Sequence, residues 1–169
     1  MRISFDLDDT LICYQPHVPC EPRRVPFLLR RWFDEPLRAG TIDLLSELTR
    51  RGWDIWIYTT SGRSERYMRW WLRFFGIRLG GVVNEYTHRR RVPLAQRVSK
   101  YPPYFHIDLH IDDSEGVRME GEKYGFEVLT ISPDDPDWTT RVLAAAAKFE
   151  QPHLAPGEDT RGNRPNVRP

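Results

Sequence analysis

Short apolar runs alternate with amphipathic stretches over most of the chain. The apolar runs have the length of buried strands, and the stretches between them repeat apolar residues every three or four positions, as helices do. The expected strands are residues 2–8, 54–59, 81–84, 107–111 and 126–132. The expected helices are residues 27–33, 41–51, 63–75 and 116–124, followed by one that opens at Asp135 and Pro136 and runs through the alanines at 144–147. Strands that alternate with helices predict an α/β fold, a three-layer, doubly wound parallel sheet with helices on both faces.

Capping residues sharpen some of these boundaries. Thr41 is placed to cap the helix that follows it, and Gly52 and Gly76 stand where a helix ends in the left-handed conformation. Residues 88–98 carry no comparable signal and fit a loop and a helix equally well.

The chain is expected to form one domain with two irregular segments. Residues 12–36 are rich in proline, which denies them regular backbone pairing, so they are predicted to form a flap-like loop around the short expected helix. After residue 150 the composition changes to Pro, Gly, Asn, Asp and Arg with almost nothing to bury. We therefore expect a single domain over residues 1–150 and a flexible tail over residues 151–169.

Charge and composition narrow the classes of function. The chain has 25 basic and 24 acidic residues, a net charge of +1, so no global field marks it as a binder of nucleic acid or membranes. No apolar run approaches the roughly 20 residues that span a bilayer, and no leader peptide precedes the first strand, so a cytoplasmic location is expected. Cys13 and Cys20 are then expected to be free thiols; the alternative is a zinc site that adds His17 and lacks an evident fourth ligand.

Three carboxylates follow the first strand immediately. Asp6, Asp8 and Asp9 stand together, with the hydroxyl of Thr10 beside them. Carboxylates held a few ångströms apart repel one another, so a proton or a cation must neutralise the group. Hard oxygen ligands suit Mg²⁺. The segment therefore indicates magnesium-dependent phosphate chemistry.

Polar side chains also end two other expected strands. Thr59, followed by Thr60, ends the second strand, while Asp112 and Asp113 end a later one that Lys100 precedes. In a parallel sheet the carboxyl ends of the strands share one edge, where ligands bind. We expect Thr59, Lys100 and the backbone N–H of Thr60 to bind phosphate oxygens.

Magnesium is the expected cofactor at this edge. An attacking carboxylate and a phosphate dianion approach each other only when their charge is neutralised. The expected metal-binding residues are Asp6, Asp8 through its backbone carbonyl, and Asp112 or Asp113.

These motifs resemble those of the haloacid dehalogenase superfamily, in its branch of aspartate-nucleophile phosphatases. The first motif, Asp-x-Asp-x-Thr, stands here as residues 6–10. The second, an apolar strand that ends in Thr or Ser, stands as residues 55–59, and the fourth, an apolar strand that ends in two acids, as residues 111–113. The third motif is a single lysine. Its candidate is Lys100, with four possible substitutes in Arg89, Arg90, Arg91 and Arg97.

The resemblance implies a Rossmann-like core and magnesium-dependent hydrolysis of a phosphomonoester. Asp6 would attack phosphorus and become an aspartyl phosphate, and Asp8 would protonate the leaving oxygen and then activate water. The loops after the first two motifs are too short for the cap domains of many members. The site is therefore expected to be open, and the phosphorylated substrate could be a small molecule, a polynucleotide end or a phosphoprotein.

Two other classes fit part of the pattern. A receiver domain also gathers acids, a hydroxyl and a lysine at strand ends, but its acceptor aspartate follows a middle strand, where this chain has Thr59. A binding or interaction module that kept the fold and lost turnover fits all the motifs. Turnover of p-nitrophenyl phosphate separates this module from the phosphatase.

Arginine is concentrated in two further stretches of the chain. An oligomer is compatible with the sequence, which does not determine the number of subunits. In the expected helix 63–75, arginine recurs at helical spacing beside aromatic residues: Arg66, Arg69, Arg73, Tyr67, Trp70, Trp71 and Phe74. Core packing of the aromatic side is the preferred interpretation, and a stacking surface for single-stranded nucleic acid is the alternative. Residues 88–91, His-Arg-Arg-Arg, are either an anion site or a solvated run.

The flap supplies candidate contacts to a substrate. They are Tyr14, Gln15, His17 and Arg23, with a plain surface loop as the alternative.

Overall fold

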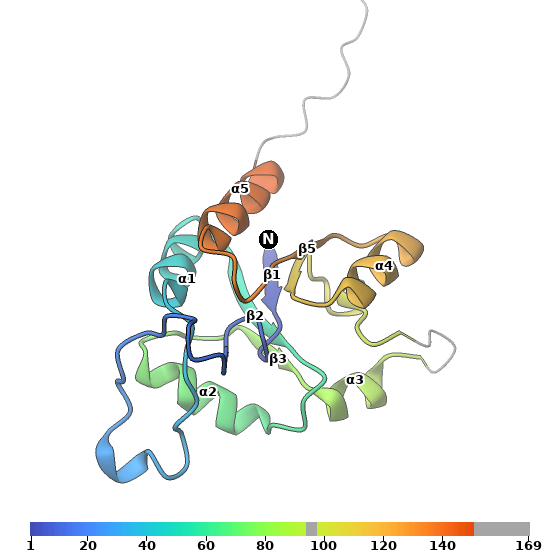
Figure 1. The fold of residues 1–169 in the computed structure, drawn as a ribbon. Helices are drawn as coiled ribbons and strands as arrows, with labels where there is room; N and C mark the ends of the chain where they lie inside the picture. Colours follow the sequence, from blue (N-terminus) through green and yellow to red (C-terminus); the bar gives the residue numbers. More distant parts are fainter. Residues whose placement is uncertain (94–97, 151–169) are drawn as a thin grey trace, which may run out of the picture.

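A five-stranded parallel sheet lies at the centre of a computed structural model, which describes residues 1–93 and 98–150 (Figure 1). The strand order is β3-β2-β1-β4-β5. The strands are β1 (Arg2–Phe5), β2 (Asp54–Tyr58), β3 (Gly81–Val83), β4 (Leu109–Asp112) and β5 (Val128–Thr130). The predicted α/β class and parallel sheet are confirmed. The predicted tail and the candidate Arg97 lie outside the described residues.

Helices cover both faces of the sheet. Figure 1 shows α1, α2 and α5 on one side and α3 and α4 on the other. Their bounds are α1 (Thr41–Arg50), α2 (Glu65–Phe74), α3 (Glu85–Arg91), α4 (Glu115–Tyr124) and α5 (Trp138–Glu150), with two 3-10 helices, η1 (Phe27–Leu29) and η2 (Pro102–Phe105). The predicted three layers are therefore present. No helix among the described residues has the length and apolarity needed to cross a bilayer.

The two faces of β2 show how the sequence divides the core. Ile55 and Ile57 point into the larger apolar cluster, which α1, α2 and α5 complete. Trp56 and Tyr58 point the other way, into a smaller cluster with Phe105. Successive strand residues face opposite sides, so one short run serves both layers.

One predicted helix cap and one predicted helix start are wrong. Thr41 is the first helical residue of α1 rather than its cap, because its hydroxyl donates to the Arg38 carbonyl at 2.7 Å and Gly40 takes the capping position with φ 84°. The last helix begins at Trp138 rather than at Pro136. The carboxylate of Asp135 accepts a hydrogen bond from the Asp137 N–H at 2.9 Å, so residues 135–137 form a turn before the helix.

Two ambiguous or overlong segments also take definite forms. The expected helix 27–33 shrinks to η1, whose N-cap Pro26 provides no side-chain hydrogen bond. Of the ambiguous stretch 88–98, residues 88–91 are helical as the end of α3. The side chain of Asn84 caps this helix, because it accepts a hydrogen bond from the Thr87 N–H at 2.9 Å. Segment 12–36 otherwise contains no helix or strand.

Candidate active site

The loop after β1 is a tight turn at the carboxyl edge of the sheet. The Leu7 carbonyl accepts hydrogen bonds from the N–H groups of Leu11 at 2.9 Å and Ile12 at 2.7 Å. Asp9 adopts the left-handed conformation with φ 57°, and its carboxylate accepts a hydrogen bond from Gln15 at 2.8 Å. The turn ends β1 at Phe5, earlier than predicted, and leaves Asp6 and Asp8 in the connection that follows.

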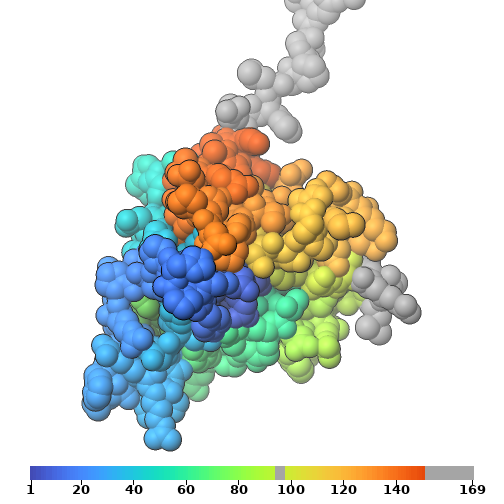
Figure 2. All heavy atoms as spheres, in the orientation of Figure 1, coloured from blue at the N-terminus to red at the C-terminus, as the bar shows by residue number. Residues whose placement is uncertain are grey.

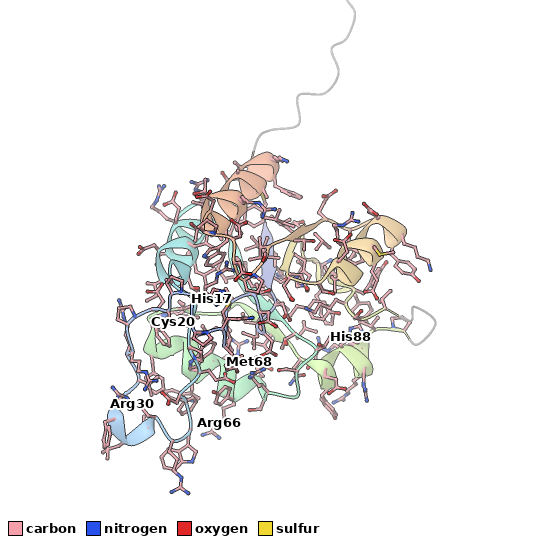
Figure 3. All side chains as sticks on the ribbon, viewed as in Figure 1. His17, Cys20, Arg30, Arg66, Met68 and His88 are labelled. Atoms are coloured by element: carbon pink, nitrogen blue, oxygen red, sulfur yellow. The ribbon has the colours of Figure 1, made fainter. Side chains whose placement is uncertain are left out.

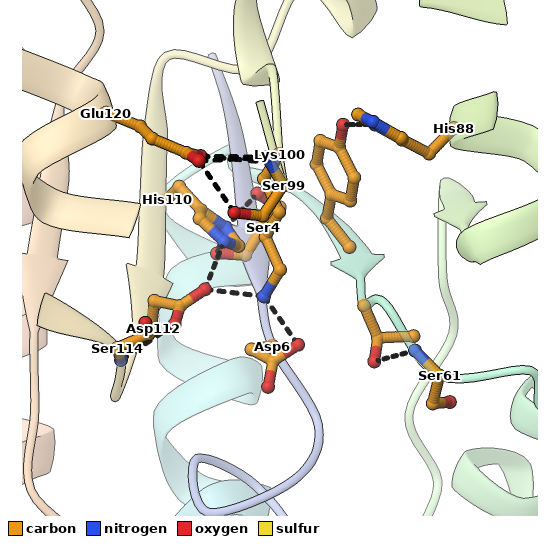
Figure 4. A network of polar contacts seen from close by, with 12 residues as sticks. Ser4, Asp6, Ser61, His88, Ser99, Lys100, His110, Asp112, Ser114 and Glu120 are labelled. Atoms are coloured by element: carbon orange, nitrogen blue, oxygen red, sulfur yellow. Dashed lines mark hydrogen bonds and ion pairs between the residues drawn. The ribbon is translucent and has the colours of Figure 1, made fainter. Parts of the chain in front are cut away.

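Lys100 bridges two buried carboxylates. Its Nζ lies 2.6 Å from Oδ1 of Asp6 and 2.5 Å from Oδ2 of Asp112, and all three side chains are buried (Figure 4). Burial raises the pKa of Asp6 above its ordinary value, although the Lys100 ammonium opposes this rise. Of the candidate cations, Lys100 is thus one that lies between the carboxylates of the first and fourth motifs. The substitute Arg89 pairs instead with Glu85 at 2.7 Å.

Asp112 is the end of a buried chain of hydrogen-bonded side chains. His110 Nε2 lies 2.8 Å from Oδ2 of Asp112, and His110 Nδ1 lies 2.8 Å from the hydroxyl of Ser4. A carboxylate only accepts, so Nε2 carries the proton and Nδ1 accepts from Ser4. Burial lowers the pKa of His110 and would by itself raise that of Asp112. Hydrogen bonds from His110 and Lys100 nevertheless hold the pKa of Asp112 below its ordinary value.

Contacts from three elements hold the irregular segment that carries Lys100. Glu120 of α4 accepts hydrogen bonds from the N–H of Ser99 at 3.0 Å and from its hydroxyl at 2.7 Å. The Tyr101 N–H donates to the phenol oxygen of Tyr58 in β2 at 2.8 Å. That phenol donates in turn to His88 Nδ1 of α3 at 2.6 Å. Lys100 is thus held in place although it lies in no helix or strand (Figure 4).

Asp8 belongs to a separate, more exposed group. Arg63 binds it through both guanidinium nitrogens, NH1 to Oδ2 and NH2 to Oδ1, each at 2.8 Å. The Nε of the same arginine donates to Glu35 at 2.7 Å, and NH2 also reaches the Tyr14 hydroxyl at 3.1 Å. Burial would lower the pKa of Arg63, but its hydrogen bonds to Asp8 and Glu35 raise it. The planar fork of arginine fixes both oxygens of Asp8.

The remaining predicted residues lie at the ends of β2 and β4. Thr59 is buried, and its hydroxyl oxygen accepts a hydrogen bond from the Ser61 N–H at 3.1 Å, while Thr60 is exposed. Asp113 follows Asp112, and burial, reinforced by the charge of Asp112, raises its pKa to about 6. A cation beside Asp113 would offset the cost of keeping its charge in this environment.

The donor set fits a magnesium ion that keeps water ligands. Within residues 1–93 and 98–150, no cluster of three or more His, Cys, Asp or Glu side chains is arranged as a metal site. Mg²⁺ commonly binds through one or two carboxylates and retains several waters. Asp6 with Asp112 or Asp113 meets that need. The side chain of Asp8 is engaged by Arg63, so Asp8 would contribute its backbone carbonyl.

Most of the other candidates are engaged elsewhere. His17 binds Asp134 at 2.6 Å and Arg23 pairs with Asp34 at 3.2 Å, whereas Tyr14 and Gln15 reach the site through Arg63 and Asp9. Cys13 and Cys20 are free thiols, and burial raises the pKa of Cys13 to about 11.

The two adjacent tryptophans of α2 differ in burial. Trp71 is fully buried as predicted, whereas Trp70 is 52% exposed and does not pack in the core.

Sequence reasoning missed several residues of the site. Ser4 and His110 are partners in the β1–β4 register, each two residues before a site aspartate, so strand alternation already placed them on the same face. Polar residues at buried strand positions were the signal that could have found them. Arg63 and Glu35 carried no such signal, because they come from loops that only the tertiary fold brings together.

Comparisons with known proteins agree on the fold. The sequence matches no protein-family model and no curated protein. Among solved structures, a HAD-family enzyme from Bacteroides thetaiotaomicron in complex with magnesium and inorganic phosphate is 12% identical, with a TM-score of 0.50 over 83% of this chain and 98% of that one. Its aspartate-to-alanine variant, with the same ligands, gives a TM-score of 0.51 at the same identity and coverage.

A larger protein shares the same core. A chain from a Pnkp1/Rnl/Hen1 complex is 15% identical and aligns over 76% of this chain with a TM-score of 0.50, but this chain spans only 45% of its length. At these identities the likeness concerns the fold. The chain therefore shares the α/β fold of these HAD-family structures, the fold that its motifs led us to expect.

Proposed function

We propose that the protein is a magnesium-dependent phosphatase that hydrolyses a phosphomonoester through an aspartyl phosphate on Asp6. The observation that carries this proposal is the Lys100 ammonium between Asp6 and Asp112 at the carboxyl edge of the sheet. An ammonium there can bind a phosphoryl oxygen next to the attacking carboxylate. Motif order supports the same assignment, because the acid, hydroxyl, lysine and paired acids follow one another as in aspartate-nucleophile phosphatases.

The two aspartates of the first loop take different roles in the reaction. An oxygen of Asp6 attacks phosphorus, and the bond to the leaving oxygen breaks as Asp8 gives that oxygen a proton. In the second step Asp8 removes a proton from water, which attacks phosphorus, releases phosphate and restores Asp6. Arg63 holds both oxygens of Asp8 in its carboxylate form, which is the form that takes the proton from water, and one of these two contacts opens when Asp8 carries the proton.

The other groups bind and neutralise the phosphoryl unit. Lys100 and the hydroxyl of Thr59 bind its oxygens, with the backbone N–H of Thr60 as a further donor. Asp6, the backbone carbonyl of Asp8, and Asp112 or Asp113 would hold magnesium. When bound, the ion offsets the repulsion between the attacking carboxylate and the phosphate.

The test is release of phosphate from p-nitrophenyl phosphate by the full chain with and without magnesium. We expect turnover that EDTA abolishes, a loss of about a thousandfold or more in Asp6→Asn, and a loss of about a hundredfold or more in Asp8→Asn. Asp43→Asn, at an exposed position on α1, is the matched control and should keep full activity. No turnover by metal-loaded wild type on this substrate or on a panel of phosphoesters would instead favour a binding module.

A further inference from the structure

An exposed tip of the flap combines arginine with aromatic side chains. Phe27 is 79% exposed and Trp32 is 61% exposed, in and just after η1. Arg24 and Arg31 are exposed beside them, and neither forms an ion pair with any described residue. Figure 2 shows this blue segment projecting from the body of the molecule at the lower left. Large apolar side chains that are exposed close together, unlike single ones, mark an interaction site.

Helix α2 carries a second set of the same kind. Arg66, Trp70 and Arg73 recur at i, i+4 and i+7, so they form one stripe along the helix. All three are exposed, and within residues 1–93 and 98–150 neither arginine has an acidic partner. The buried face of α2 is made instead by Met68, Trp71 and Leu72. The stripe therefore contributes nothing to the core.

Aromatic packing joins the tip to the helix. Phe33 stacks on Tyr67 with ring centroids 5.1 Å apart and meets Phe74 edge-on at 5.4 Å. Tyr67 and Phe74 lie beside the stripe on the helix surface, so the two sets are neighbours. Figure 3 shows Arg30 on the tip and Arg66 on α2 at the same lower end of the molecule. We name the combined set the arginine–aromatic surface; it comprises Arg24, Phe27, Arg31, Trp32, Arg66, Trp70 and Arg73.

This surface begins at the candidate active site. Arg63, the residue that binds Asp8, directly precedes the Ser64 cap of α2, and Arg66 is the second residue of that helix. The N-terminal end of α2 therefore connects the candidate active site to the surface.

We propose that the arginine–aromatic surface binds single-stranded polynucleotide and that the phosphatase site acts on its terminal phosphate. Arginines spaced among exposed aromatic rings suit a strand that alternates phosphates with stacking bases. The repeated negative charge of such a strand complements the four arginines of this surface, because the neighbouring acids Asp34 and Glu65 pair with Arg23 and Arg69 instead. The strand-binding step is independent of turnover, whereas the choice of substrate rests on the proposed function.

The test is fluorescence anisotropy with a labelled single strand of about 12 nucleotides that lacks terminal phosphates. Wild type should bind it in a salt-dependent manner. Trp32→Ala/Trp70→Ala should weaken binding about tenfold or more, and Arg31→Gln/Arg66→Gln should reduce the slope of log affinity against log salt by about 1.4. The matched control is Met119→Ala/Lys123→Gln, which removes one exposed apolar side chain and one charge from α4 and should bind as wild type does.

Activity separates this inference from the proposed function. Both surface variants should hydrolyse p-nitrophenyl phosphate as wild type does, while kcat/KM for a phosphorylated oligonucleotide falls by the factor seen in binding. Strand binding without any turnover would leave the surface in place and contradict only the phosphatase. Three outcomes would overturn the surface assignment: no strand binding at low salt, surface variants that bind as wild type does, or a surface used instead for phosphatidylserine vesicles or self-association.

Discussion

Asp6 and Asp8 are two residues apart in one turn, yet they lie in contrasting environments. The side chain of Asp6 is 10% exposed and pairs with Lys100, which contacts from α3, α4 and β2 hold in place. The side chain of Asp8 is 42% exposed and pairs with Arg63, whose other partners, Glu35 and Tyr14, belong to the flap. Asp6 is therefore held by contacts with the core, whereas Asp8 is held by residues of loops.

The difference suggests how the work of the site is divided. A nucleophile benefits from a fixed position, because small displacements from attack geometry cost large factors in rate. An acid that must exchange protons with a leaving group and then with water needs access to both. The buried half of the site, Asp6 with Lys100 and Asp112, would accordingly determine both the nucleophilic step and the stability of the fold. The flap half, Asp8 with Arg63, would determine proton transfer alone.

Removal of Lys100 should have the largest effect. Lys100→Met leaves Asp6 and Asp112 buried without their shared cation, so we expect a loss of about 3–5 kcal/mol in the free energy of unfolding together with loss of turnover. Urea denaturation measures the first effect. Lys123→Met, at an exposed position, should stay within about 0.5 kcal/mol of wild type. Equal stability of the two variants would show that the bridge does not hold the buried half together.

Replacement of Arg63 should affect catalysis and leave stability nearly unchanged. Arg63→Lys keeps the charge but loses the two-pronged contact with Asp8. We expect kcat to fall about tenfold to a hundredfold for an alkyl phosphate, whose leaving oxygen needs a proton. The loss should be smaller for p-nitrophenyl phosphate. An equal loss on both substrates would mean that Arg63 binds the phosphoryl group rather than orienting Asp8.

Asp6→Asn should raise stability in the absence of magnesium. Burial raises the pKa of Asp6 in the folded chain, although Lys100 opposes it, so the folded state binds this proton more tightly than the unfolded state does. The resulting stability is present below the unfolded pKa, about 4, and is lost as pH rises through the folded pKa. Asparagine does not ionise, so the variant does not lose this stability as pH rises. Thermal melts from pH 4 upward should show its advantage over wild type growing, and a variant less stable at every pH would contradict this.

The flap should give the smallest effect. Tyr14 is exposed, and its hydroxyl contacts Arg63 at 3.1 Å and Glu35 at 3.3 Å. Tyr14→Phe should therefore change kcat by less than about tenfold and stability by less than about 0.5 kcal/mol. Steady-state kinetics on the alkyl phosphate checks the first point. A hundredfold fall in kcat would contradict this prediction and show that the flap is essential for catalysis.

The buried half of the site was largely predictable from the sequence. Asp6 directly follows one apolar strand and Asp112 ends another, and parallel strands bring their carboxyl ends to one edge, so spacing and alternation suffice to bring the two residues together. Lys100 followed from the scarcity of lysine in the chain. Its support by Glu120, Tyr58 and His88 depends on packing between elements that no local pattern encodes.

The flap half and the helix faces were harder to predict. Arg63 meets Asp8 across 55 positions of sequence and Glu35 across 28, which only the tertiary fold determines. Trp70 and Trp71 are adjacent and chemically identical, but one step along a helix turns a side chain by about 100°. A shift of one residue in the assumed helix phase therefore exchanges the core residue for the exposed one.

The phosphorylated enzyme intermediate offers the most direct test of the central claim. The full chain with magnesium would be mixed with a ³²P-labelled phosphomonoester, quenched in acid and reduced with borohydride, which converts an acyl phosphate into an alcohol. Peptide mass spectrometry should then find homoserine in place of Asp6, in larger yield in Asp8→Asn, where hydrolysis is slowed. Turnover without label on the protein, or label on any other residue, would contradict the account.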